Sequence, residues 1–272
     1  MPWSRPPSLS GSGHPHERIH TTTPPLPLCQ PLLHEISTML RSTLPLLAAG
    51  LLLSAVAQEG AAQGVTVDQG TFRILSEGTE VGTEEFVIRR AGSGADQQVI
   101  ATAEIQLRVP EGNTSLVPLL QATGGDMAVS AYQIKVSGAT QEEVMMELGA
   151  GRYLSRVRSE RGEREREYRA ATGTILLDPG VAHQYYFLAA RLSNGSATLP
   201  AISPREGRQF ELRVTTVAAA TTVTLVEGSV QGRHLRIEGD GRVRELWLDA
   251  SDRVLRVEDP DRGYTAIRLR AP

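Results

Sequence analysis

Cysteine and histidine, two side chains that often serve as nucleophile and as general base, are scarce in this 272-residue sequence. The one cysteine is Cys29, and four of the six histidines precede residue 39, which leaves His183 and His234 for the rest of the chain. With only these two histidines, far apart in the sequence, there is little from which to build a serine triad or a histidine-rich metal site. The sequence therefore predicts no catalytic thiol, no metal and no cofactor.

His183 could work as an acid or base with Asp178 or with Asp249. The carboxylates of Asp249 and Asp252 form a second candidate pair. Each residue also has a structural explanation: Asp178 suits a helix N-cap, the other two aspartates suit a turn, and His183 suits a helix surface or a core. Carboxylates in turns are too common to indicate catalysis. We therefore expect a protein that is not an enzyme, with a hydrolase as the weaker alternative.

Residues 39–57 contain the three parts of a secretory signal peptide in order. Arg41 supplies the positive charge, residues 44–56 form the apolar core, and Ala55-Val56-Ala57 is a small-residue cleavage site. The apolar run stops before Gln58, well short of the roughly 20 residues that a spanning helix needs. An uncleaved anchor is the alternative. We expect an exported protein, periplasmic or extracellular, with no transmembrane segment after cleavage.

Residues 1–38 differ in composition from everything that follows. They hold eight of the 16 prolines and runs rich in Ser, Thr and His. Such a bias cannot bury a core and predicts disorder. We interpret 1–38 as a leader upstream of the true start at Met39, and a genuine disordered extension is the alternative.

The charges of the chain are nearly balanced, with 28 Lys and Arg against 31 Asp and Glu and a net charge of −3. After residue 57, no stretch is basic without interleaved acidic residues. This pattern argues against a nucleic-acid partner.

Short segments with β-branched and alternating residues, separated by Gly, Asp, Asn and Pro, recur over residues 58–272 and predict a single antiparallel β domain. No β–α–β alternation suggests a parallel sheet. Residues 144–148 also fit a helix that begins near Thr140, but their alternation favours a strand. The predicted strands are 71–75, 80–90, 97–109, 115–122, 127–136, 144–148, 153–159, 163–169, 174–177, 209–217, 221–230, 234–238, 243–248, 254–258 and 264–269.

The charge-rich residues 153–169 are interpreted as a hairpin that turns at Arg161-Gly162. In that register Arg158 faces Glu165 and Arg156 faces Glu167, and opposite charges across an antiparallel pair are stabilising. The alternating charges then indicate a solvated sheet face, which we prefer over a binding patch.

One segment breaks the β pattern and predicts a helix. Asp178 is a favourable N-cap, Pro179 suits the first helical position, and Asn194-Gly195 favours an end. Aromatic residues 185–187 point around much of such a helix, so more than one of its faces should be covered. An apolar stripe at helical spacing is formed by Val181, Tyr185, Leu188 and Leu192. We therefore expect a mainly β fold: a curved antiparallel sheet or incomplete barrel wrapped around one central helix.

Three segments carry a family resemblance: FRILSEGTEVGTEEFVIRR (72–90), LLDPGVAHQYYFLAARL (176–192) and LWLDASDRVLRVEDP (246–260). They resemble bacterial exported proteins of unknown function related to the LolA and LppX lipoprotein-carrier architecture. Residues 185–187 match the aromatic helix segment, and Trp247 matches the tryptophan of the terminal strand. The resemblance implies an incomplete barrel curved around a helix, sometimes with an apolar cavity for acyl chains, and none of the three segments is a catalytic signature.

The function that we expect is binding of a lipid or another hydrophobic ligand in the concavity of the sheet. The alternative is an envelope scaffold or interaction protein with a filled core, whose protein partner the sequence does not identify. Aromatic residues make up only 4% of the chain, so packing competes with ligand lining for each of them. The candidate lining residues are Phe72, Phe86, Tyr153, Tyr185, Phe187 and Trp247.

Overall fold

The computed structural model describes residues 64–110, 112–192 and 195–272. The leader 1–38, the signal peptide 39–57 and the predicted helix end at Asn194 lie outside these residues. The described strands are β1 (Val65–Ser76), β2 (Thr79–Ala91), β3 (Gln98–Val109), β4 (Gly112–Thr123), β5 (Ala128–Gly138), β6 (Glu142–Gly149), β7 (Arg152–Ser159), β8 (Gly162–Arg169), β9 (Ile175–Leu176), β10 (Ser196–Ser203), β11 (Arg208–Thr224), β12 (Ser229–Gly239), β13 (Arg242–Leu248), β14 (Val254–Asp259) and β15 (Tyr264–Arg268).

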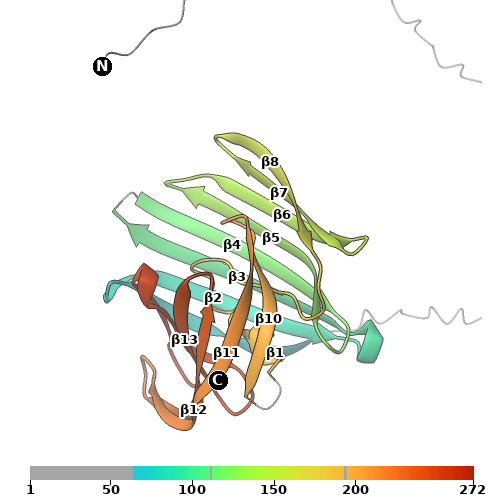
Figure 1. Cartoon of the computed structure of the whole chain (residues 1–272). Coiled ribbons are helices and arrows are strands. Elements are labelled where there is room, and N and C mark those ends of the chain that lie inside the picture. Colours follow the sequence, from blue (N-terminus) through green and yellow to red (C-terminus); the bar gives the residue numbers. More distant parts are fainter. Residues whose placement is uncertain (1–63, 111, 193–194) are drawn as a thin grey trace, which may run out of the picture. The chain divides into compact units, whose positions relative to one another are not determined.

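All fifteen strands belong to one curved sheet (Figure 1). Its order is β8-β7-β6-β5-β4-β3-β2-β1-β15-β14-β13-β12-β11-β10-β9, so nearly every strand pairs with its neighbour in the chain. The exception is the antiparallel pair β1 and β15, which joins the first strand to the last. The expected mainly β, curved antiparallel sheet is confirmed, although β9 and β10 are parallel.

The core lies on one face of the sheet because the strands alternate between buried and exposed residues. β3 shows this plainly: Val99, Ala101, Ala103 and Ile105 are buried, and the residues between them face solvent. At one edge of the sheet, β8 has a single buried residue, Tyr168, and is otherwise charged. Charges on an edge strand discourage pairing with another chain.

The sheet is not closed into a barrel, but its β8 edge is held to the β10–β11 turn by side chains. The amide of Gln209 accepts a hydrogen bond from the backbone N–H of Arg169 at 3.2 Å and donates one to its carbonyl at 2.7 Å. Arg166 donates to the carbonyl of Gly207 at 3.1 Å. These contacts join the β8 edge to β11 and the turn before it, and not to β9, the strand at the opposite edge of the sheet.

The predicted helix at 179–193 is largely wrong. Only α1 (Tyr185–Ala189) is helical, while most of the segment from Thr174 to Ala189 is buried in irregular structure against the inner face of the sheet. Asp178 does not cap the helix, and Gly180 has a left-handed φ of 76°. The Glu84 carboxylate on β2 accepts hydrogen bonds from the backbone N–H groups of Ala182 and His183, each at 2.8 Å, so tertiary contacts replace the first helical turns.

Two strand predictions also need correction. β10 was not expected, and the break predicted near residue 220 lies inside the long strand β11, where the register to β12 shifts.

In the β7–β8 hairpin, the turn is Glu160-Arg161, so Arg158 faces Glu163 and Arg156 faces Glu165. The expected register was wrong by two residues, a shift that keeps every side chain on its face and still opposes unlike charges.

Candidate functional site

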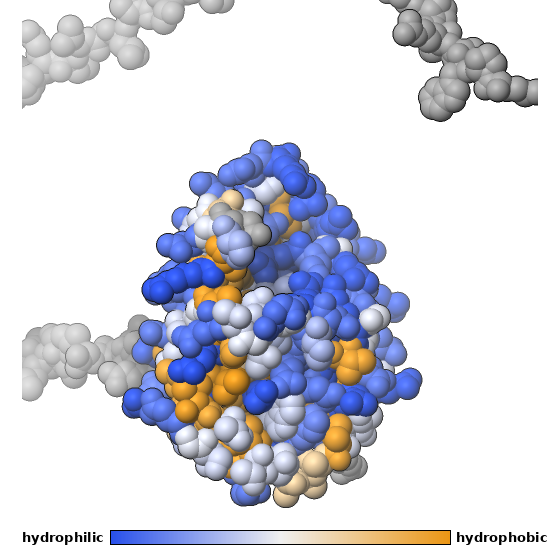
Figure 2. Space-filling model, turned by 90° about the vertical axis from the view of Figure 1, so that its left-hand side faces the viewer, coloured by the Kyte–Doolittle hydropathy of each residue, from blue (hydrophilic) through white to orange (hydrophobic). Residues whose placement is uncertain are grey.

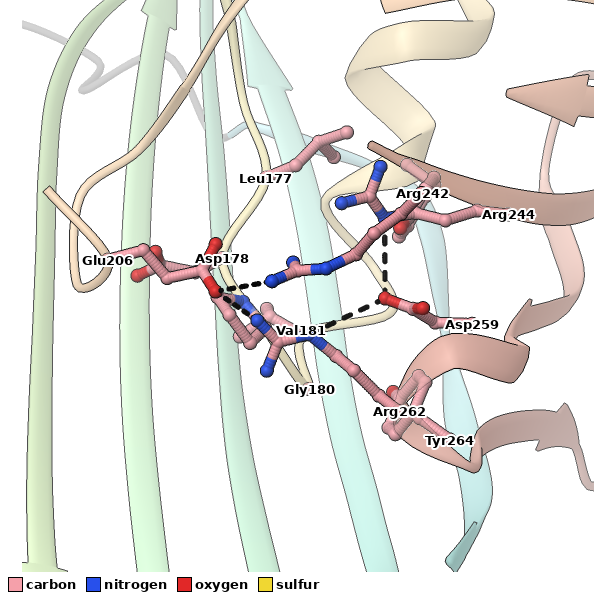
Figure 3. A pocket seen from close by; sticks show the side chains of 12 residues that line it. Leu177, Asp178, Gly180, Val181, Glu206, Arg242, Arg244, Asp259, Arg262 and Tyr264 are labelled. Atoms are coloured by element: carbon pink, nitrogen blue, oxygen red, sulfur yellow. Dashed lines mark hydrogen bonds and ion pairs between the residues drawn. The ribbon is translucent and has the colours of Figure 1, made fainter. Parts of the chain in front are cut away.

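A cavity of about 240 Å³ lies where the buried segment before α1 meets β13, the end of β14 and the β10–β11 turn (Figure 3). Its lining residues are Leu177, Asp178, Pro179, Gly180, Val181, Tyr185, Glu206, Arg242, Arg244, Asp259, Arg262 and Tyr264. We call this cavity the arginine pocket. Three arginines and three carboxylates line it, although most of the surrounding core is apolar.

Strand alternation directs two of the arginines into the pocket. Arg242 and Arg244 continue the inward face that carries Leu246 and Leu248 on β13, where apolar residues would normally stand. Asp259 is the inward residue at the end of β14, after buried Val257. Arg242, Arg244 and Asp259 therefore stand on paired strands, which hold charged groups more rigidly than a loop does.

The third arginine, Arg262, comes from the short 3-10 helix η2 (Pro260–Arg262) that follows β14. It contacts the same Glu206 oxygen to which Arg242 Nη2 donates at 3.3 Å. Figure 3 shows Arg242 and Arg262 reaching across the pocket to Glu206 from the opposite side. On the other flank, Arg244 Nε lies 3.4 Å and Arg262 Nε 3.6 Å from Asp259 Oδ2.

Several polar atoms of the pocket are buried without a hydrogen-bond partner among the described residues. They are Arg242 Nη1, Arg244 Nη1, Asp259 Oδ1 and the hydroxyl oxygen of Tyr264. Arg242 Nη1 makes only a long ion-pair contact, 3.5 Å from Asp240 Oδ2. A buried polar group without a partner costs about 1–3 kcal/mol, so proteins keep few of them. Four around one cavity indicate a place where a ligand or ordered water completes the hydrogen bonds.

Burial shifts the pKa values of three pocket residues upward. It raises the pKa of Asp259, against the opposing charges of Arg244 and Arg262. It also raises the pKa of Tyr185 to about 12 and that of Tyr264 well above its ordinary value, so both hydroxyls are neutral donors at neutral pH. For Glu206, the effect of burial is outweighed by the hydrogen bond from Arg242 and the charge of Arg262, and its pKa is lowered.

Asp178 closes the inner side of the pocket and holds two strands to the buried segment. Its carboxylate accepts hydrogen bonds from the hydroxyl of Tyr132 on β5 at 2.9 Å, from Ser203 Oγ on β10 at 3.3 Å and from the backbone N–H of Arg205 at 3.1 Å. Arg205 Nε also lies 3.5 Å from it. This carboxylate has a structural role, though not the N-cap role expected from the sequence.

Asp178→Asn should change how stability depends on pH. Burial raises the pKa of Asp178, and the charge of Arg205 opposes this only in part. The folded state therefore holds the proton more tightly than the unfolded chain, a contribution to stability that is present at low pH and lost as the pH rises through the folded pKa. We expect the free energy of unfolding of wild type relative to D178N to increase as the pH falls from about 7 to about 4.

Urea unfolding at several pH values measures this difference. The matched control is Asp96→Asn at an exposed position in the turn before β3, which should show no such trend. A difference that shrinks as the pH falls would contradict the expected direction.

Among the described residues, His183 makes no hydrogen bond with Asp178 or Asp249, whereas Asp249 and Asp252 share one turn, in which the backbone N–H of Asp252 donates to the carbonyl of Asp249 at 3.1 Å. His183 is fully buried, and its Nδ1 lies 2.7 Å from Glu84 Oε1, a partner that sequence reasoning missed. Asp249 accepts hydrogen bonds from the backbone N–H groups of Ser251 and Arg253, as expected of a turn residue. Asp252 has a left-handed φ of 63° and pairs with Arg233.

The six aromatic candidates are divided between two hydrophobic clusters. Phe72, Phe86, Tyr153, Tyr185 and Phe187 belong to the main core and are at most 7% exposed. Phe72 stacks on Phe86 at 5.1 Å, and the Tyr153 hydroxyl donates to the carbonyl of Val129 at 3.0 Å. Trp247 packs on a second, smaller cluster, and it stacks on His234 at 4.3 Å. Of the six, Tyr185 lines the arginine pocket.

The arginines of this pocket were not among the predicted site residues. The signal was present in part, because Arg244 shares an alternating face with Leu246 and Leu248. Glu206 and Asp259 gave no comparable signal, since a turn and a strand end often carry carboxylates.

No protein family and no curated protein matches this chain. One similar solved structure is the crystal structure of a beta-barrel-like protein of domain of unknown function DUF1849 from Brucella abortus. It has a TM-score of 0.46 and 11% sequence identity, and the match covers 74% of this chain and 94% of that chain. The sequence resemblance to lipoprotein carriers stays a prediction.

Proposed function

We propose that this protein is an exported, non-catalytic binding protein that holds a small polar molecule in the arginine pocket. The observation that carries this proposal is the set of buried donors and acceptors without partners around a cavity of about 240 Å³. Sites for drug-sized ligands are usually about 300–1,000 Å³, so this pocket suits a smaller molecule or the polar end of a larger one.

The absence of catalysis in this proposal is supported by the position of His183. A general base must come within hydrogen-bond reach of its substrate, either directly or through one water. His183 and its partner Glu84 are both fully buried, and neither lines the arginine pocket. The Glu84 carboxylate is instead engaged by two backbone N–H groups.

Export is proposed from residues 39–57, with the periplasm or the outside of the cell as the destination. None of the described helices is long and apolar enough to cross a membrane. Mass spectrometry of the exported protein is expected to find a mature chain that begins after Ala57, and recovery of a peptide from residues 1–38 would contradict the assignment of the leader.

The second candidate function is an envelope scaffold with a filled core. It is favoured by the dense packing of the inner face, where the segment from Thr174 to Ala189 occupies space that a lipid would need. On the outer face, apolar side chains such as Val117, Met145 and Leu154 are partly exposed. Figure 2 shows hydrophobic residues gathered in patches on an otherwise hydrophilic face.

Binding of a lipid or another hydrophobic ligand among the core aromatics stays a prediction.

Native mass spectrometry of protein recovered from its export compartment tests the binding function. We expect wild type to carry a small-molecule adduct that Arg244→Met loses. The matched control is Arg236→Met on the exposed face of β12, which should keep the adduct. A bare wild-type polypeptide that co-purifies in a stoichiometric complex with another protein would overturn the binding function and favour the scaffold.

A further inference from the structure

We propose that the arginine pocket recognises an oxyanion, a carboxylate or phosphate group, through Arg242 and Arg244. This inference rests on the proposed binding function and names its ligand class. It is carried by three features of the pocket: an excess of positive charge, donors that outnumber free acceptors, and two arginines aligned on one strand face.

The charges around the pocket do not cancel. The three arginines and three carboxylates of the lining balance, and Arg205, which lies beside Asp178 just outside the lining, leaves one positive charge in excess when all are ionised. The arginines are Arg205, Arg242, Arg244 and Arg262, and the carboxylates are Asp178, Glu206 and Asp259. At the border, Asp240 pairs with Arg208 and also lies 3.5 Å, through Oδ2, from Arg242 Nη1; the charges of Asp240 and Arg208 cancel and add no net charge. Burial also raises the pKa of both Asp178 and Asp259, which weakens them as counter-ions.

The unpartnered atoms favour a ligand that accepts hydrogen bonds. Arg242 Nη1 and Arg244 Nη1 can only donate, and the neutral Tyr264 hydroxyl can donate as well. Against these three donors stand Asp259 Oδ1 on the lining and, just outside the lining, Asp240 Oδ2, which lies 3.5 Å from Arg242 Nη1. A cation or a ligand made only of donors would leave the arginine N–H groups without partners, whereas an oxyanion offers several lone pairs.

The two arginines are placed to converge on one group. They are two residues apart on β13 and point to the same side, so their Cα atoms are about 6.6 Å apart along the strand. Arg244 is 6% exposed and is already paired with Asp259 through Nε, which fixes the plane of its guanidinium group and leaves Nη1 free. Planar guanidinium groups match carboxylate and phosphate oxygens in geometry as well as charge.

Ligand-dependent stability tests the inference on the mature protein. Thermal unfolding is followed with sulfate, phosphate and succinate, each against chloride at equal ionic strength, because a ligand that binds the folded state raises its stability in a saturable way. We expect saturable stabilisation of wild type and of R236M, and a dissociation constant weaker by about tenfold or more in R244M. Arg242→Gln, at a less buried guanidinium, should weaken binding too and keeps the test valid if R244M folds poorly.

Competition distinguishes a free oxyanion from a lipid headgroup. Vesicles of phosphatidylglycerol that displace sulfate would indicate a headgroup, and vesicles without effect would indicate a free molecule; either supports the oxyanion. If wild type carries an adduct that oxyanions do not displace and R244M retains, the inference is overturned and binding elsewhere stands. If wild type carries no adduct and no oxyanion stabilises it, the inference and the binding function fail together.

Discussion

Glu84→Ala is expected to lower the free energy of unfolding by about 3–5 kcal/mol. The carboxylate is completely buried on β2, and it accepts hydrogen bonds from the backbone N–H groups of Ala182 and His183 at 2.8 Å each, with His183 Nδ1 at 2.7 Å. Its removal leaves these groups without a partner inside the core. It also releases the segment before α1, which packs against the inner face of the sheet.

Urea unfolding followed by far-UV circular dichroism measures this effect. The matched control is Glu85→Ala, the next residue on β2, whose side chain is exposed and which should change stability by less than about 0.5 kcal/mol. Glu84→Gln keeps the size of the side chain and one acceptor oxygen, so it should fall between the two. An E84A protein within about 1 kcal/mol of wild type would show that this buried cluster does not hold the segment in place.

Most strands were predictable from the sequence because they bury one face, and burial on one face imposes a period of two. This is why residues such as Val99, Ala101 and Ile105 identified β3. The pairing of β1 with β15 was not predictable, since it joins residues about 200 positions apart through backbone groups that are the same in every residue. The β7–β8 register was ambiguous for a related reason: a shift of two residues changes neither face nor charge pattern.

The segment before α1 shows where local signals fail. The local signals that favour a helix are Asp178, Pro179 and the apolar stripe. The buried carboxylate of Glu84, however, offers the backbone N–H groups of this segment a stronger hydrogen-bond partner than a helical turn would. Tertiary contacts often override local propensity in this way. The arginine pocket could not be predicted from the sequence for a similar reason. Its charged residues include ones from β13, η2 and a turn, and these elements meet only in the folded chain.

Arg268→Met is expected to lower the free energy of unfolding by about 3–5 kcal/mol, because it leaves the buried carboxylate of Asp68 without its counter-ion. The two side chains form a bidentate pair, with Nη2 at 2.7 Å and Nη1 at 3.2 Å from the carboxylate oxygens. Arg268 also donates to the carbonyls of Gln69 and Val254, at 2.6 and 3.1 Å. It therefore connects β1 to β15 and β14, where the first and last strands of the sheet pair.

A double-mutant cycle measures the interaction energy of the Asp68–Arg268 ion pair separately from the packing of each side chain. Asp68→Leu in the R268M protein removes the orphaned charge, so the double variant should recover about 2 kcal/mol relative to R268M alone, since apolar replacements of buried ion pairs are often tolerated. Arg270→Met serves as the control, because its ion pair with Glu227 is exposed and should be worth less than about 1 kcal/mol. If the two core substitutions were additive, the Asp68 charge would not be the cause of the R268M defect. The joint between β1 and β15 would then depend on the backbone ladder and on the carbonyls that Arg268 holds.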